Sequence, residues 1–138
     1  MCIRDSYQTA ISNVIKSTLE ISGLKPDEVG HVHAHGLSAL KVDREEAAAI
    51  KENLNATPVT AAKSYMGNLG AGSGMVEIIA SILAMKNDQL FPVLNFETAD
   101  PDCPINVVAE ETSPGDNFIN LNITPQGQAS AVLVAKAG

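Results

Sequence analysis

The fold is decided by residues 29–62, which read VGHVHAHGLSALKVDREEAAAIKENLNATPVTAA. The apolar run Val29–Ala34 predicts a short buried strand, and Pro58–Ala62 predicts a second one. The residues between them predict a helix that runs through an alanine-rich stretch to about Leu54. A strand, a helix and a second strand in this order favour an α/β fold, in which layers of helices pack against a sheet.

The start of this helix carries a capping pattern. Asp43 is suited to the N-cap position, where a side-chain oxygen accepts a hydrogen bond from an amide of the first turn. Glu46 follows at the spacing of a capping-box partner. The sequence therefore predicts a helix that begins at Asp43.

The flanking segments extend the pattern. Tyr7–Ser22 predicts a helix with a single apolar stripe. Met75–Met85 is apolar almost all round, which predicts a helix buried over most of its surface. Phe118–Ile123 and Ala131–Ala135 predict two final strands joined by a short turn.

The size and charge of the chain exclude several function classes. It has 138 residues and a mass of 14.4 kDa, which suits one compact domain or a piece of a larger one. Its 9 basic and 16 acidic residues give a net charge of −7, which disfavours nucleic acid and a basic membrane-docking face. No apolar run approaches the ~20 residues that span a bilayer, and no signal-peptide pattern opens the chain. We therefore expect a soluble, cytoplasmic protein with no nucleic-acid or membrane partner.

The beginning of the chain differs in style from the rest. Its first six residues, MCIRDS, lack periodicity and resemble a translated adapter remnant. We expect residues 1–6 to be a non-native leader and residues 7–138 to form the domain, as a fragment of a longer natural chain.

The cysteines Cys2 and Cys103 make neither a disulfide framework nor a metal motif. Because negative neighbours raise a thiol pKa, the acidic surroundings of Cys103 indicate a structural role.

Three histidines alternate at His31, His33 and His35, so on a strand they share one face with neighbours ~7 Å apart. A pair at this spacing can bind zinc together with a carboxylate, but no third ligand stands at a telling position. The alternative is a set of hydrogen-bonded histidines at a strand end. His35 differs from the other two because a glycine follows it at the end of the strand, where loops build sites.

A glycine-rich loop, KSYMGNLGAGSG at residues 63–74, leads into the apolar helix. Glycines before a helix can cradle a phosphate, but neither nucleotide-binding fingerprint is met, and close packing of the helix explains small residues equally well. Lys63 opens the loop and Glu77 lies in the helix, where a carboxylate needs a partner, so a Lys63–Glu77 ion pair is the natural hypothesis. Asn68 suits a turn.

Together these motifs resemble the C-terminal half of a β-ketoacyl-acyl-carrier-protein synthase, a condensing enzyme of the thiolase-like family. The resemblance rests on the order and spacing of several pieces, and it runs from about Tyr7 to Lys136. The pieces are His35-Gly36-Leu37-Ser38, Asp43-x-x-Glu46, Lys63-Ser64-x-Met66-Gly67, the GAGSG run that ends at Gly74, Glu77 and Asn95-x-Glu97-x-x-Asp100-Pro101. The resemblance implies the C-terminal half of a five-layer α-β-α-β-α fold, with a mixed sheet and helices.

The resemblance also implies a chemistry. This is decarboxylative Claisen condensation of a malonyl thioester with an acyl thioester, in fatty acid or polyketide synthesis, without a metal or other cofactor. His35 is then the histidine that donates a hydrogen bond to the malonyl thioester carbonyl, where negative charge develops. Lys63 is the active-site lysine and Glu77 its partner. The motif residues that support the site are Gly36, Asp43, Glu46 and Gly67.

Two positions depart from the family pattern. Asn68 stands where the elongating enzymes place a second active-site histidine, and an asparagine amide can donate to an enolate oxygen but cannot carry a proton. The family's gating loop aligns with residues 122–128, where Gln126 takes the place of the gating phenylalanine. The pocket residues expected from this loop are Thr124, Gln126 and Gly127. We therefore expect an acyl pocket of a different shape.

Two hypotheses remain open. The first is a catalytic condensing enzyme with a His/Asn pair, and the second is a non-catalytic homologue, comparable to a chain-length factor, that shapes a partner's acyl pocket. Retained His35 and Lys63 favour catalysis, while the altered gating loop favours the second hypothesis. The resemblance implies as partners an acyl carrier protein, the N-terminal half of the same synthase, and a second synthase in a homodimer or heterodimer. The isolated fragment is expected to be inactive, because the nucleophilic cysteine belongs to the absent first half, which neither Cys2 nor Cys103 matches.

Overall fold

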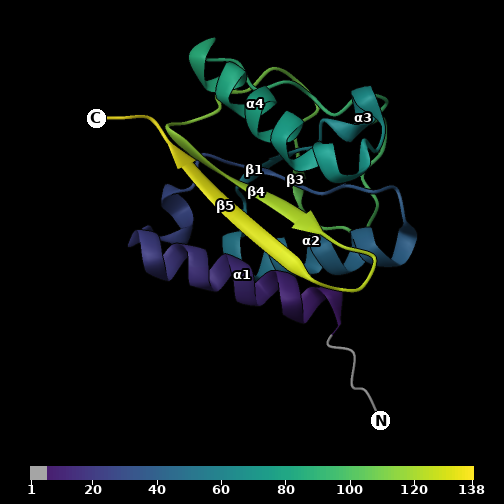
Figure 1. Ribbon diagram of the computed structural model, residues 1–138. Coiled ribbons are helices and arrows are strands. Elements are labelled where there is room, and N and C mark those ends of the chain that lie inside the picture. Colours follow the sequence, from purple (N-terminus) through teal and green to yellow (C-terminus); the bar gives the residue numbers. More distant parts are fainter. Residues whose placement is uncertain (1–5) are drawn as a thin grey trace.

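The computed structural model describes residues 6–138, which form a mixed five-stranded sheet with helices on both faces (Figure 1). The strands are β1 (His31–His33), β2 (Pro58–Thr60), β3 (Asn106–Val107), β4 (Asn117–Ile123) and β5 (Ala129–Ala135). Their order is β3-β2-β1-β4-β5, and every neighbouring pair is parallel except the antiparallel pair of β4 and β5. The helices are α1 (Tyr7–Ser22), α2 (Leu40–Leu54), α3 (Lys63–Met66) and α4 (Ser73–Lys86). The predicted α/β class is confirmed.

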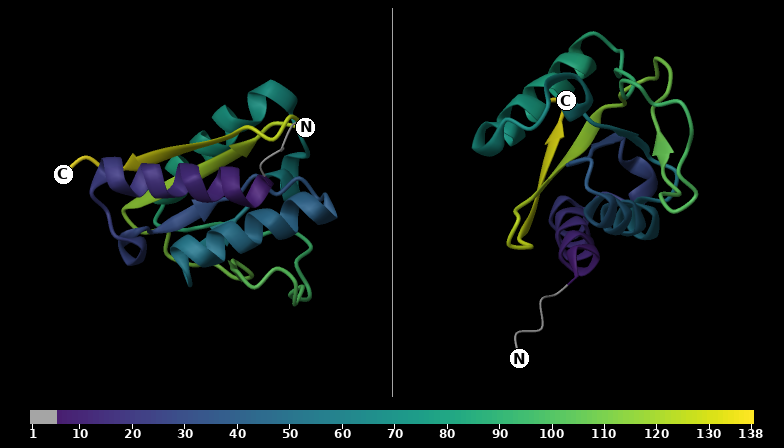
Figure 2. Two further views of the ribbon diagram at one scale, coloured as in Figure 1. Left: turned by 90° about the horizontal axis from the view of Figure 1, so that it is seen from below. Right: turned by 90° about the vertical axis from the view of Figure 1, so that its right-hand side faces the viewer.

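The elements form three layers. Helices α1 and α2 lie side by side under one face of the sheet, and α3 and α4 cover the other face (Figure 2). The main core lies between the first pair of helices and the sheet, where Ile11, Ile15, Val32, Ile50 and Ile119 are fully buried. No helix of residues 6–138 is both long and apolar enough to cross a membrane.

Helix α1 has the bounds that the sequence predicts. The Ser6 hydroxyl caps its first turn by accepting a hydrogen bond from the Thr9 amide at 3.2 Å. Gly23 ends it in the left-handed conformation, with φ of 72°, and its amide donates to the Leu19 carbonyl. Of the predicted leader at 1–6, residues 1–5 lie outside the described part of the chain.

Helix α2 begins earlier than its capping pattern predicts. Ala39 is the N-cap residue, and Asp43 lies inside the first turn with its amide donating to the Ala39 carbonyl at 2.9 Å. The prediction of an Asp43 cap with Glu46 as capping-box partner is therefore wrong, because the helix already begins at Leu40 and the Glu46 carboxylate binds the amides of His35 and Gly36. The predicted end at about Leu54 is confirmed.

Helix α4 is amphipathic in an inverted sense. Its polar residues Ser73, Glu77 and Ser81 are buried against the sheet, whereas Met75, Ile79 and Leu83 are exposed. The expectation that this helix is buried over most of its surface is therefore wrong for the 138-residue chain, because its outer face is exposed. An outer face of large apolar side chains is unusual for a helix that covers a sheet.

The two final strands and the turn between them are confirmed as a hairpin. Strand β1 is shorter than the predicted run Val29–Ala34, although Val29 and Ala34 are buried. The predicted glycine-rich loop contains a single helical turn, α3, and a 3₁₀ turn at Gly70–Gly72. Strand β3 is two residues long and was not predicted.

Candidate active site

His35 lies just beyond the carboxyl end of β1, at the edge of the sheet where loops of parallel strands build binding sites. The Glu46 carboxylate of α2 fixes the backbone at this point. It accepts hydrogen bonds from the amides of His35, at 2.7 Å, and Gly36, at 3.0 Å. Gly36 has a φ of 51°, and a Cβ there would approach Ala61 Cβ to 3.0 Å. Glu46 thus holds the turn that presents His35 instead of capping its own helix.

Lys63 and Glu77 form a buried ion pair beside His35, as the sequence predicts. Their side chains are only 6% and 2% exposed. The second oxygen of Glu77 accepts from the side-chain amides of Asn120 at 3.1 Å and Asn122 at 3.5 Å. Both carboxylate oxygens are therefore partnered, which is the condition for keeping this charge buried.

The Lys63 ammonium also lies 3.4 Å from His35 Nδ1. An ammonium can only donate, so Nδ1 is the acceptor and the neutral ring carries its proton on Nε2. Burial lowers the pKa of His35 to about 4, helped by the positive charge of Lys63 and opposed by a hydrogen bond with Asn122. At neutral pH His35 is therefore an uncharged hydrogen-bond donor.

His35 lines a cavity of about 750 Å³ at this edge of the sheet. Asn68 and Asn122 line it from two other elements. The Asn68 side-chain oxygen accepts from the Gly70 amide and the Ser73 hydroxyl, both at 3.1 Å, so the Nδ2 group is the part of the amide left to donate. The structure thus brings His35 and Asn68 to one cavity.

The loop predicted to gate the pocket contributes only in part. Thr124 lines the same cavity, together with its neighbour Pro125. Gln126 is exposed at the tip of the hairpin, and neither it nor Gly127 is among the lining residues. Gly67, the remaining motif glycine, ends α3 with a φ of 70° and donates its amide to the Lys63 carbonyl at 2.9 Å.

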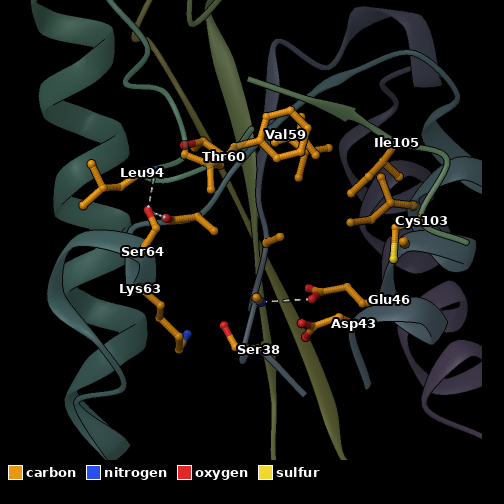
Figure 3. A pocket seen from close by; sticks show the side chains of 18 of the residues that line it. Ser38, Asp43, Glu46, Val59, Thr60, Lys63, Ser64, Leu94, Cys103 and Ile105 are labelled. Atoms are coloured by element: carbon orange, nitrogen blue, oxygen red, sulfur yellow. Dashed lines mark hydrogen bonds between the residues drawn. The ribbon is translucent and has the colours of Figure 1, made fainter. Parts of the chain in front are cut away.

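A second cavity, of about 490 Å³, lies on the far side of Lys63. Figure 3 shows Lys63 on one wall and Asp43, Glu46 and Cys103 on the other. Burial raises the pKa of Glu46 to about 7, opposed by the two amides that it binds, and raises that of Asp43. Burial and nearby carboxylates raise the pKa of the Cys103 thiol, which makes it a weak nucleophile.

Comparison with known proteins places the chain in a family. Residues 2–97 match the family model described as the C-terminal domain of beta-ketoacyl synthase. The chain belongs to this family. A 3-oxoacyl-acyl-carrier-protein synthase 2 from Synechocystis sp. is 37% identical over 101 residues, which cover 70% of this chain and 24% of the relative.

Two solved structures are similar over 95% of this ketosynthase domain and 34% of their own chains. One is the ishigamide ketosynthase/chain length factor, with 25% identity and a TM-score of 0.89. The other is the AntDE:AntF complex of a type II polyketide synthase acyl-carrier protein with its ketosynthase, with 26% identity and a TM-score of 0.87. The fold is that of the C-terminal half of a thiolase-like synthase. The chain spans about a third or less of the length of the curated relatives that it matches.

The other two histidines of the ketosynthase domain are hydrogen-bonded inside it. His31 and His33 are completely buried and both contact the Ser81 hydroxyl, which confirms that they share one face of β1. Within residues 6–138, no group of three or more histidines, cysteines or carboxylates is arranged to hold a metal ion. The observed bonds fit the alternative of hydrogen-bonded histidines at a strand.

The glycine-rich loop is explained in part by packing. A Cβ on Gly74 would approach the Asn122 side chain to 2.7 Å, so a larger residue there would push α4 away from β4. Gly70 has a φ of 61°, which favours glycine in the turn around Asn68.

Sequence analysis missed three residues of the candidate site, of which Asn120 and Ser81 are buried and Asn122 is half-buried. Asn120 and Asn122 hold Glu77, and Ser81 lies one helical turn after Glu77 on the same buried face of α4. A signal existed for the first two: asparagines two positions apart share one face of a strand that is otherwise apolar. For Ser81 the signal was its spacing of four residues from Glu77.

Proposed function

We propose that this chain is the C-terminal part of a β-ketoacyl-acyl-carrier-protein synthase. The whole protein condenses malonyl-acyl carrier protein with an acyl thioester, with loss of carbon dioxide, in fatty acid or polyketide synthesis. The observation that carries the proposal is the arrangement of His35, Lys63 and Glu77 at the carboxyl edge of the sheet, in a chain of this family.

His35 is the donor to the malonyl thioester. As the bond between the malonyl carboxylate and its α-carbon breaks, the electron pair moves toward the thioester carbonyl and negative charge gathers on its oxygen. A neutral imidazole with its proton on Nε2 stabilises that oxygen by donating a hydrogen bond. Burial keeps the ring uncharged, and Lys63 supports this state because its ammonium donates to Nδ1 and its charge lowers the pKa further.

Asn68 supplies a second donor in this proposal. Its oxygen is occupied by Gly70 and Ser73, and its Nδ2 group is left to point at the same carbonyl oxygen. The enolate carbon then attacks an acyl group held on a cysteine of the first half of the synthase. Cys103 does not replace that cysteine, because it faces the other cavity and its thiol pKa is raised.

The remaining predicted residues have supporting roles. Glu46 fixes the turn at Gly36, Asp43 faces the same cavity as Glu46, and Gly67 ends the helical turn that carries Lys63. The hairpin loop shapes the acyl pocket through Thr124, with Gln126 and Gly127 at its tip. Residues 7–138 are the synthase domain.

We infer three partners. An acyl carrier protein delivers the substrates, a role supported by the similarity to a ketosynthase whose complex with such a protein is known. The first half of the synthase covers the apolar outer face of α4, at Met75, Ile79 and Leu83. A second synthase, identical or related, completes a dimer. The protein works in the cytoplasm, without a metal or other cofactor.

A second candidate is a non-catalytic subunit that shapes the acyl pocket of a partner synthase. The similarity to a structure described as a ketosynthase/chain length factor supports it, as does the altered gating loop, whose Gln126 is exposed at the tip of the hairpin. The buried His35, Lys63 and Glu77 cluster supports catalysis instead, because a subunit without turnover has no use for an ion pair that is costly to bury.

The deciding experiment uses the full reading frame that contains this chain. Purified protein is assayed for decarboxylation of malonyl-acyl carrier protein, with His35→Ala and Asn68→His as variants. Activity that falls at least about a hundredfold in His35→Ala supports the enzyme. Inactivity of the parent and of Asn68→His, in a folded protein that binds a partner synthase, would favour the non-catalytic subunit.

A further inference from the structure

The buried histidine His33 makes a set of contacts that the proposed chemistry does not use. Its Nε2 lies 3.0 Å from the amide nitrogen of Ala62, and its Nδ1 lies 2.8 Å from the Ser81 hydroxyl. Ala62 is the N-cap residue of α3 and immediately precedes Lys63. One imidazole ring therefore connects β1 and α4 to the backbone that carries the lysine.

The partners fix the position of each proton. A backbone amide can only donate, so Nε2 of His33 is an acceptor and the proton of the neutral ring lies on Nδ1. Nδ1 then donates to the Ser81 oxygen. On the other side His31 Nδ1 donates to the Pro114 carbonyl at 2.7 Å, which leaves its Nε2 to accept the Ser81 proton at 3.0 Å. In this series of hydrogen bonds, from the Ala62 amide to the Pro114 carbonyl, every donor meets an acceptor.

Protonation of His33 would break the hydrogen bond to Ala62, because the added proton on Nε2 would face the N–H group of that residue. Burial, together with the neighbouring His31 and Lys63, lowers the pKa of His33 to about 3. Phe91 packs edge-on against the ring at 5.8 Å. The ring is therefore a permanent acceptor at neutral pH.

One face of α4 contacts the side-chain end of Lys63 directly and positions the backbone before Lys63 through His33. Glu77 binds its ammonium, and Ser81, one turn further along, orients the histidine that binds the amide before it. We propose that His33 is a positioning residue: its neutral Nε2 anchors the Ala62 amide and so sets where α3 presents Lys63 to His35. This inference rests on the proposed function only in taking Lys63 as an active-site group.

The test uses two substitutions that differ by one methylene group. In His33→Gln the side-chain oxygen reaches the place of Nε2, whereas in His33→Asn it reaches only the place of Nδ1. Hydrogen exchange of the Ala62 amide is measured by NMR in the full 138-residue chain. We expect His33→Gln to keep the protection of the parent, and His33→Asn to lose it by about tenfold or more, since a buried donor is left unpaired.

Two further readouts separate positioning from general stability. The nitrogen spectrum of the parent should show His33 with its proton on Nδ1 and no titration between pH 5 and 8. The ammonium resonance of Lys63 should shift in His33→Asn and stay in place in His33→Gln. Val32→Ala is the matched control, because Val32 is equally buried on β1 but faces the opposite core. It should lower the melting temperature and leave the Ala62 and Lys63 signals unchanged.

Three results would overturn the inference. They are a proton on Nε2 of His33, equal Ala62 protection in the two variants, and a Lys63 signal that moves in Val32→Ala as it does in His33→Asn. None of these readouts requires turnover. If they hold while the full-length protein fails to decarboxylate malonyl-acyl carrier protein, the proposed function is wrong and the anchoring role of His33 stands.

Discussion

Glu46 shows how one carboxylate couples stability to pH. Its side chain is buried, and burial raises its pKa to about 7 from the ordinary glutamate value of 4.5. A raised carboxyl pKa means that the folded state binds more protons than the unfolded state between these two values, so stability falls as pH rises through that window. The quantity to follow is the free energy of unfolding of the parent minus that of the Glu46→Gln variant. We expect this difference to fall by on the order of 3 kcal/mol as the pH rises from about 4.5 to 7. Urea titrations across that range measure it, and a flat difference would contradict the assignment.

The Lys63–Glu77 pair should show strong coupling. Removal of either partner leaves a buried charge, so we expect Lys63→Met and Glu77→Gln each to cost about 3 kcal/mol. The double variant Lys63→Met/Glu77→Gln should cost clearly less than the sum of the two single costs, since neither charge then remains. Chemical denaturation of the four proteins completes the double-mutant cycle. Additive costs would show that the two groups do not depend on each other.

The junction of β1 and β4 depends on two glycines. A Cβ on Gly30 would lie 2.5 Å from the Asn117 carbonyl and 2.6 Å from the Pro114 carbonyl, and Gly115 approaches it from the same side with a φ of 71°. We expect Gly30→Ala to destabilise the chain by about 2 kcal/mol or more, because the backbone of β4 must move. Gly72→Ala is the control, since a Cβ there meets nothing within 4 Å. Melting temperatures compare the two, and an equal effect would contradict the close approach.

Helix α4 shows where sequence patterns stop being informative. Its run of apolar residues correctly predicts a helix. The pattern cannot show whether the apolar side chains are buried within this chain or against a second protein domain. The same holds for Asp43 and Glu46, whose spacing fits a capping box while the helix begins at Leu40 and Glu46 binds the turn at His35 instead. The two-residue β3 has no periodicity to detect. By contrast, α1, the final hairpin and the Lys63–Glu77 pair follow directly from spacing and from the cost of burying a charge.

The outer face of α4 gives a direct test of its interface role. We expect Ile79→Lys with Leu83→Lys to change the stability of the 138-residue chain by less than about 1 kcal/mol, because both side chains are about half exposed. The same change should reduce self-association in sedimentation velocity. Ile21→Lys on α1 is the control, since Ile21 is 87% exposed on another face. If Ile21→Lys reduced self-association as much as the double change on α4 does, the outer face of α4 would not be the surface through which the chains associate.

At the scale of the whole molecule, the part of the chain that the structure describes combines hydrogen-bond donors at one cavity with a single thiol, Cys103, whose pKa is raised. We expect the purified 138-residue chain to show no condensing activity with acyl and malonyl thioesters, since Cys103 and His35 line different cavities and the Cys103 thiol has a raised pKa. Addition of the missing first half should restore turnover. Condensation by the chain alone, lost in His35→Ala, would overturn this expectation.

The order of the strands also determines when the site can form during translation. Strand β1 lies at the centre of the sheet, yet one of its two neighbours, β4, follows it in the sequence only after α2, β2, α4 and β3. His35, Lys63 and Glu77 therefore emerge from the ribosome well before Asn120 and Asn122, which complete the hydrogen bonds of Glu77. Until that distant segment arrives, a nascent chain carries a carboxylate without its amide partners and a central strand with one open edge. Such a chain exposes an open strand edge to association with other chains, and the cluster around His35 is completed only when the β4–β5 hairpin docks.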